Sequence, residues 1–170
     1  MLSLVSSDNN KNNINQNDHK DENPEKEETI SYKSKDNVNF RLSLTSLIAE
    51  VIESPEASND ILIPTFIEYQ SKQFKILHIC DEAFKNSSIK SLSFSKDSEV
   101  QRIGNFAFDN SPIIQLNIPQ SLIKLSKQWI QGADELNEIK VDEKNKNEKT
   151  PIELTNNEDI KKMLSIELDQ

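Results

Sequence analysis

The residue types that most often perform chemistry in proteins are few in this chain and are poorly arranged for it. There are two histidines, His19 and His78, which is too few for the three-histidine set of many catalytic zinc sites. Asp81 and Glu82 are adjacent, so their carboxylates diverge, whereas a pair that performs acid–base catalysis must converge on one bond. Only two glycines are present, which excludes a glycine-rich phosphate loop, and no Gly-x-Ser-x-Gly elbow occurs. We therefore expect no enzyme and no cofactor or metal.

The cysteine content limits the kinds of covalent and metal site that the chain can form, and the net charge limits the kinds of partner that it can bind. The single cysteine, Cys80, excludes an intramolecular disulfide framework and a cysteine-rich zinc site, and its apolar surroundings predict a structural thiol. The net charge of −9 argues against nucleic acid or an anionic membrane surface, because both require a basic face. No stretch approaches the roughly 18 apolar residues of a membrane helix, and the N-terminal apolar stretch is too short for a signal peptide. We expect a soluble chain without membrane insertion, cytoplasmic by default.

The most informative pattern is a repeat. The phrase "AFKNSSIKSLSF" at 83–94 returns 24 residues later as "AFDNSPIIQLNIP" at 107–119, and a weaker copy at 125–141 has Trp129-Ile130 in place of Ala-Phe. Steps of 24 and then 22 or 23 residues fall in the range of leucine-rich solenoid coils. The corresponding positions are Ile79/Ile103/Leu125, Phe84/Phe108/Ile130, Ile89/Ile113/Leu136, Leu92/Leu116/Ile139 and Phe94/Ile118/Val141.

Each copy of the repeat combines two different spacings of apolar residues. The closing pairs alternate apolar with polar residues, which is typical of a strand with one buried face. The Ile-x-x-x-Ala-Phe part spaces its apolar residues at i, i+4 and i+5, which predicts one inward-facing helical turn. Because no coil can bury its own apolar stripe, the coils must stack, with parallel strands on one face and helical turns on the other. We predict this α/β solenoid with a core that contains Ile79, Phe84, Leu92, Phe94, Ile103, Phe108, Leu116, Ile118, Trp129, Ile139 and Val141.

The flanking segments divide the chain further. Residues 1–37 are polar and contain few large apolar side chains, so they are predicted to be a disordered tail. Residues 38–78 are predicted to form an N-terminal cap, with a hairpin over 66–77 and, at 60–64, a first "DILIP" strand. About three coils follow over 79–145. In the polar segment 146–170, the spacing of Thr155 and Glu158 indicates a short helix near 156–165, which either covers the end of the solenoid or lies free.

The repeat unit "I-x-x-x-AF-x-N-S-x-I-x-x-L-x-I-P" resembles the leucine-rich repeat of the BspA-like surface proteins of bacteria and trichomonad-type protozoa. The stretches "ILIPTFIEYQSKQFKILHI", "SEVQRIGNFAF" and "WIQGADELNEIKV" are also similar to that family, and the resemblance covers roughly residues 40–145. It implies a right-handed solenoid and an adhesion or protein-recognition role, and it allows a location at the cell surface. About three coils are fewer than the family often has, so the expected binding surface is small.

The candidate binding residues lie between the apolar pairs of each strand, where side chains point outward. Leucine-rich solenoids generally bind through their sheet face, and an ordinary solvated surface is the alternative for any single member of the row. The predicted row consists of Leu62, Ser91, Ser93, Ser95, Gln115, Asn117, Glu138, Lys140 and Asp142.

Three functions remain open on this evidence. The leading hypothesis is a recognition module that binds a protein partner through the row. The second is a scaffold or regulatory protein that acts through its acidic N-terminal tail and its end helix, which would fold on contact. The third, an enzyme with a composite site, has no support in the residues.

Overall fold

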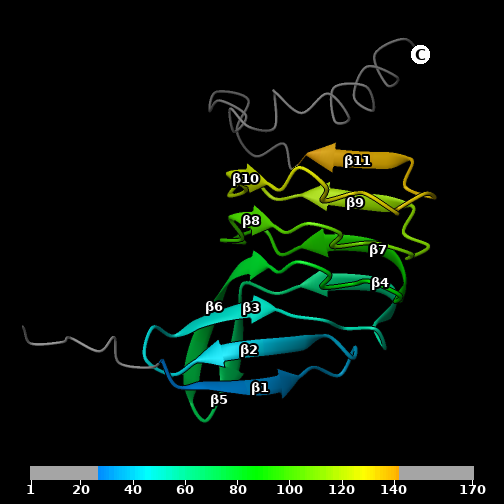
Figure 1. The fold of residues 1–170 in the computed structure, drawn as a ribbon. Coiled ribbons are helices and arrows are strands. Elements are labelled where there is room, and N and C mark those ends of the chain that lie inside the picture. The colour runs from blue at the N-terminus through cyan, green and yellow to red at the C-terminus, as the bar shows by residue number, and fades with distance from the viewer. Residues whose placement is uncertain (1–26, 142–170) are drawn as a thin grey trace, which may run out of the picture.

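The computed structural model describes residues 27–141 and contains two β-sheets stacked into a solenoid (Figure 1). Among the described residues there is no α-helix. The strands are β1 (Thr29–Lys33), β2 (Asn39–Ser43), β3 (Ile48–Val51), β4 (Ser58–Ile63), β5 (Phe66–Tyr69), β6 (Lys72–Ile79), β7 (Ser88–Phe94), β8 (Arg102–Ile103), β9 (Gln115–Ile118), β10 (Lys124–Leu125) and β11 (Glu138–Val141).

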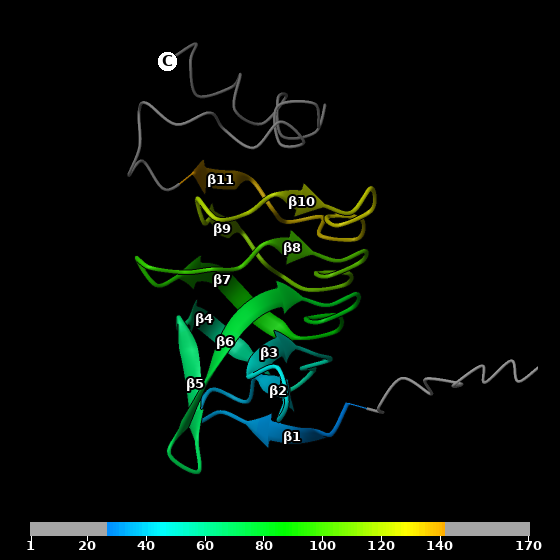
Figure 2. The ribbon, with the colours of Figure 1, turned by 90° about the vertical axis from the view of Figure 1, so that its left-hand side faces the viewer.

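The two sheets run along opposite sides of the stack. The long sheet has the order β1-β2-β3-β6-β8-β10, with β5 also paired to β6, and the short sheet has the order β4-β7-β9-β11. Figure 2 looks onto the long sheet, whose strands rise one above the other from β1 to β10. One coil comprises a strand of the long sheet, a turn and a strand of the short sheet. The pairs β3–β4, β6–β7, β8–β9 and β10–β11 make four coils, one more than predicted, because β3 and β4 form a full coil within the expected cap.

The register between coils agrees with the alignment of the repeat. Ile79 pairs with Ile103 in the long sheet, and Ile103 with Leu125. In the short sheet Leu92 pairs with Leu116, and Leu116 with Ile139. All of these pairings are parallel, so equivalent side chains of successive coils lie directly above one another.

The predicted helical turns are wrong. Residues 81–86, 105–110 and 127–132 form successive tight turns, in which bonds such as Lys85 N to Glu82 O (3.1 Å) span three residues. Other backbone N–H groups donate to the next coil, as Phe84 does to the Ala107 carbonyl at 2.7 Å, and not to the residue four positions earlier. Left-handed residues, which a right-handed helix excludes, recur within these turns: Glu82, Asn86, Phe106 and Asn110, with φ from 52° to 58°.

An aromatic column runs through the core on the side of these turns. The Phe84 and Phe108 rings are stacked with centroids 5.9 Å apart, and Trp129 meets Phe108 edge-on at 6.3 Å. All three side chains are fully buried. The other predicted core residues are also buried except Phe94 and Val141, which end their strands and are half-buried.

The fold begins earlier than predicted. Part of the expected tail, Thr29–Lys33, is the strand β1, which pairs antiparallel with β2. Its Tyr32 ring lies 6.3 Å from those of Phe40 and Tyr69, and Ile30 also packs against the core. These two apolar residues anchor an otherwise polar strand. The hairpin predicted over 66–77 is present as β5 and β6. Residues 1–26, the helix predicted near 156–165 and the rest of the C-terminal segment from 142 lie outside the described residues.

Gly104 lies where two coils come closest. A Cβ at this position would lie 2.6 Å from the carbonyl carbon of Cys80 in the preceding coil, with the backbone nitrogen of Asp81 closer still. Backbone atoms cannot move aside as a flexible side chain can, so only glycine fits here without displacing a coil.

Phe108→Ala is expected to lower the free energy of unfolding by about 3–5 kcal/mol, since it removes the central ring of the buried column. That is a large part of the roughly 5–15 kcal/mol that stabilises a typical domain. Urea unfolding measures the change, with Phe66→Ala as the control because Phe66 is 39% exposed. Equal losses from the two substitutions would contradict the buried column.

Gly104→Ala is expected to lower the free energy of unfolding by about 1–3 kcal/mol, because the added methyl group overpacks the junction between two coils. The same urea titration measures the loss, and Gln101→Ala at an exposed position of the same coil controls for a change of side chain. A Gly104→Ala protein as stable as the Gln101→Ala protein would show that the coils separate there without cost.

Candidate functional site

The outer face of the short sheet carries the predicted binding residues. Side chains alternate between the two faces of each strand, so the residues between the buried positions point to solvent. We call this surface the polar face. One row of outward residues, Asp60–Ser91–Gln115–Glu138, crosses all four strands in register. Two residues further along, Leu62 pairs with Ser93 and Asn117 pairs with Lys140.

Hydrogen bonds within the polar face hold its side chains in place. The Ser91 hydroxyl donates to the Asp60 carboxylate at 2.7 Å, which links β7 to β4. The Ser93 hydroxyl donates to the Ile61 carbonyl at 3.3 Å. Along β11, Lys140 and Glu138 form an ion pair at 2.6 Å. The face therefore presents ordered hydrogen-bond donors and acceptors.

Exposure differs among the members of the polar face. Leu62 is 58% exposed, and Lys140 is also exposed, whereas the other predicted members, including Ser95 just after β7, are half-buried. Asp142 lies outside the described residues.

The sequence prediction omitted three exposed residues of this surface. Asp60 is two residues before Leu62 on the same strand, so strict alternation alone would have placed it in the row. Lys90 and Ile114 come directly before the residues through which β7 and β9 pair with each other, and they extend the polar face at its edge. There the Ile114 N–H donates to the Lys90 carbonyl at 2.9 Å. The alternation of buried and outward residues does not predict that Lys90 and Ile114 are exposed, because each of them stands between a buried residue and another outward residue.

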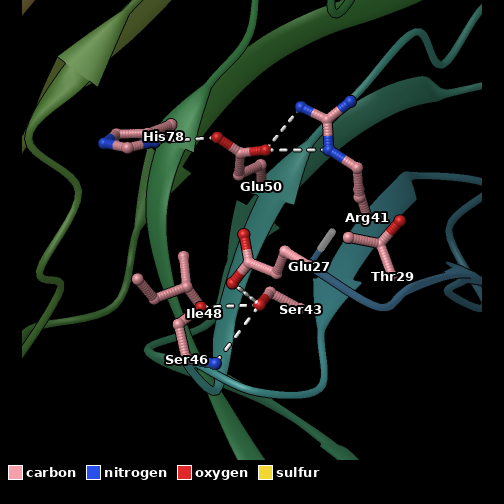
Figure 3. Close-up of a pocket in the computed structure, with 8 residues that line it drawn as sticks. All are labelled: Glu27, Thr29, Arg41, Ser43, Ser46, Ile48, Glu50 and His78. Carbon is pink, nitrogen blue, oxygen red and sulfur yellow. Dashed lines mark hydrogen bonds and ion pairs between the residues drawn. The ribbon is translucent and has the colours of Figure 1, made fainter. Parts of the chain in front are cut away.

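A concave site lies on the outer face of the long sheet, where the cap meets the coils. This cap pocket has a volume of about 240 Å³ (Figure 3). The residues that line it come from four segments of the chain, which is why no local sequence pattern predicts it. They are Glu27, Thr29, Arg41, Ser43, Ser46, Ile48, Glu50 and His78.

Glu50 is the electrostatic centre of the cap pocket (Figure 3). One carboxylate oxygen accepts a hydrogen bond from Arg41 Nε at 2.9 Å, and the other lies 2.9 Å from His78 Nδ1. Partial burial alone would raise the pKa of Glu50, but the bonds from His78 and Arg41 outweigh burial and hold it below 4.5. These two contacts of Glu50 tether β2, β3 and β6, the strands that carry Arg41, Glu50 and His78, to one another.

The other titratable groups near the cap pocket do not form a reactive set. The Glu27 carboxylate accepts from the Ser43 hydroxyl, and hydrogen bonds from Ser43 and Ser46 lower its pKa. Burial raises the pKa of the Cys80 thiol, whose sulfur lies 3.9 Å from Arg41 Nη2, so it stays protonated at neutral pH. Within residues 27–141, no group of three or more His, Cys, Asp or Glu side chains could hold a metal ion.

A comparison with family models decides the classification. Residues 65–163 match the model described as the BspA type leucine rich repeat region, in six copies. The chain belongs to this family. A search of curated proteins found no match. In the described part of the chain, no helix is long and apolar enough to cross a membrane.

Among solved structures, one supports the same fold and two others align less well. A leucine rich cell surface protein from Faecalibacterium prausnitzii A2-165 is similar, with a TM-score of 0.52 and 19% identity over 66% of this chain and 31% of that chain. The pneumococcal vaccine antigen PcpA aligns with a TM-score of 0.46 and 18% identity, over 69% of this chain and 39% of its own. A leucine-rich repeat protein from Bacteroides capillosus ATCC 29799 aligns with a TM-score of 0.45 and 17% identity, over 67% of this chain and 98% of its own. The BspA-type chain thus spans about a third of the Faecalibacterium protein.

Glu50→Gln is expected to change how stability depends on pH. The pKa of Glu50 is depressed in the folded state, below its ordinary value of 4.5. The contribution of Glu50 to the free energy of unfolding is therefore complete above about pH 4.5 and is lost as the pH falls below that value. Wild type should therefore lose more stability than Glu50→Gln between about pH 5 and pH 3, and be the more stable of the two near pH 7. Urea midpoints across this range test the expectation, with Glu68→Gln on the exposed face of β5 as the control. Parallel curves for wild type and Glu50→Gln would contradict it.

Proposed function

We propose that this BspA-type chain is a non-enzymatic recognition module that binds a protein partner through the polar face. The observation that carries the proposal is the alignment of outward side chains on four consecutive parallel strands. Such a surface is ordered before a partner binds, since the ladder holds each strand and hydrogen bonds hold several side chains. A pre-ordered surface loses little conformational entropy when a partner binds.

The chemistry of the polar face suits a protein partner. It offers serine hydroxyls and side-chain amides, one ion pair and two exposed apolar residues, Leu62, which is 58% exposed, and Ile114 at the edge of the face. An exposed leucine surrounded by polar groups provides an apolar contact with a hydrogen-bonding rim, as protein interfaces do.

The size of the polar face limits the affinity. Three inter-strand spacings of about 4.8 Å and four residues of about 3.3 Å give roughly 14 by 13 Å. This is well below the roughly 800 Å² that each partner contributes to a standard interface. The partner must therefore also contact the adjoining edge, where Lys90 and Ile114 are exposed, or bind weakly.

A location at the cell surface forms part of the proposal. The Faecalibacterium protein is a cell surface protein, and shared repeats support a similar setting here. Adhesion to protein material outside the cell would follow from that location and from the polar face together.

The double substitution Ser93→Arg/Asn117→Arg is expected to abolish partner capture without lowering stability, because it places two large cations at the centre of the face and leaves the core intact. Proteins from the source cells and their surroundings are captured on immobilised full-length chain, and wild type is compared with the variant. Circular dichroism establishes that both are folded.

The matched control is Ser31→Arg/Gln101→Arg, which adds the same charge at exposed positions associated with the long sheet. A partner captured by wild type and by this control, but lost with Ser93→Arg/Asn117→Arg, supports the proposal. A partner retained by all three folded proteins would overturn the assignment to the polar face.

A further inference from the structure

The strand β1 is the first strand of the long sheet, and its outer edge has no partner strand among the described residues. It pairs with β2 on one side only, at the end of the stack opposite β10 and β11 (Figure 1). An edge strand presents a row of unpaired N–H and C=O groups, which is a template for a further strand. The strand contains no proline and pairs with β2 without a bulge, so its backbone can accept such an addition.

The ladder with β2 determines which backbone groups of β1 face outward. At one end of the ladder the Ser34 N–H donates to the Val38 carbonyl at 2.9 Å. At the other end the Leu44 N–H donates to the Glu28 carbonyl, also at 2.9 Å. Because hydrogen-bonded and non-hydrogen-bonded pairs alternate along antiparallel strands, the even-numbered residues of β1 bond to β2. The N–H and C=O groups that point away from the sheet are those of Thr29, Ser31 and Lys33.

These outward groups are complementary to a second copy of themselves. When two copies of β1 run antiparallel about a two-fold axis at Ser31, each Ser31 pairs with Ser31 of the second copy. Thr29 of each copy then pairs with Lys33 of the other. All three pairs are of the hydrogen-bonded type, in which the two residues exchange both N–H···O=C bonds. A shift by one residue would oppose outward groups to groups already bonded to β2, and a shift by two would move Thr29 or Lys33 past the end of the other strand.

The same register brings apolar side chains together. Ile30 and Tyr32 are the two apolar residues of β1, and both are only partly buried against the core. In the two-fold pair, Ile30 of each copy lies opposite Tyr32 of the other, at a non-hydrogen-bonded position where side chains approach most closely. Aromatic and β-branched residues in such cross-strand pairs stabilise a sheet.

The charges that flank β1 favour the antiparallel arrangement. Glu27 and Glu28 come directly before the strand, and Lys35 comes two residues after its end. None of these three forms an ion pair within residues 27–141. Antiparallel pairing places the acidic start of each strand beside the basic end of the other, whereas parallel pairing would oppose like charges. Lys33 is already neutralised by Glu56 of its own chain at 2.5 Å, so its charge does not repel an added strand.

We propose that two copies of this chain associate through β1, in an antiparallel two-fold pair centred on Ser31 that continues the long sheet from one copy into the other. The interface uses the same residues on both sides, so it closes at a dimer. One strand of five residues from each copy buries far less than the roughly 1,600 Å² of a standard interface, so the dimer is expected to be weak and reversible.

Sedimentation equilibrium of the full-length chain at micromolar to millimolar concentration measures this association. Wild type is expected to shift from monomer towards dimer as the concentration rises, and Ser31→Pro is expected to stay monomeric. Proline removes the outward N–H at the centre of the pair, and this N–H does not bond to β2, so the monomer should remain folded. Circular dichroism establishes whether it does.

The matched control is Glu68→Pro on β5, which pairs only with β6. The Ile76 N–H donates to the Thr65 carbonyl at 3.2 Å, so by the same alternation the Glu68 N–H points away from β6. Glu68→Pro therefore removes an outward N–H from another edge strand, and it is expected to dimerise like wild type.

A disulfide tests the register, and it gives an answer even if Ser31→Pro fails to fold. In a Cys80→Ser background, Ser31→Cys places two thiols across the axis with Cα atoms about 5.5 Å apart, within the range of a disulfide. Mild oxidation is expected to cross-link Ser31→Cys and to leave Ser88→Cys largely uncoupled. Ser88 is exposed at the start of β7, which is an interior strand of the short sheet.

Several outcomes would overturn the proposal. They are a dimer that persists in folded Ser31→Pro, a dimer lost equally in Glu68→Pro, equal cross-linking of Ser31→Cys and Ser88→Cys, and a wild type that is monomeric at every concentration. If that monomer also protects the Ser31 N–H from hydrogen exchange, another part of the same chain covers the edge and a second copy does not. The test is independent of the proposed function, because it requires no other protein and probes β1, which is not part of the polar face.

Discussion

The parallel register between successive coils is the constraint on which the rest of the structure depends. A single coil has a narrow apolar stripe and cannot bury it, so each coil is stable only against its neighbours. The aromatic column of Phe84, Phe108 and Trp129 and the aliphatic ladders of both sheets require the same alignment. A shift of one residue would turn every inward side chain to solvent. The outward rows are aligned because the inward rows must be.

The turns between the sheets satisfy the same constraint through the backbone. Every buried N–H group needs an acceptor, and in these turns many acceptors belong to the neighbouring coil. Left-handed residues aim the N–H groups along the stack, where a helix would direct them along its own axis. Asn86 and Asn110 occupy equivalent positions, and asparagine tolerates the left-handed region better than most residues. Their side chains also bond to each other, at 2.8 Å.

Sequence reasoning recovered the parts of the molecule that repeat. Period and spacing placed the strands of the short sheet and the faces of their side chains, since alternation is a local property of a strand. The turns were misassigned because apolar residues at i, i+4 and i+5 face inward in a tight turn as well as in a helix. The strand β1 was missed because Ile30 and Tyr32 lie in a polar stretch, and contacts with β2, the Tyr69 ring and Glu56 stabilise it. The cap pocket depends on segments far apart in the chain.

The two sheets give this BspA-type chain two surfaces of different character from one repeat. On the short sheet, most of the outward positions hold small polar residues, and the polar face is close to neutral. On the long sheet, the same pairing brings arginine, histidine and lysine into one row. Because the strands β8 and β10 have only two residues each, the row is narrow and its charges cannot spread apart along them. The long-sheet surface is therefore narrow and charged, whereas the polar face offers a broader and less charged contact area.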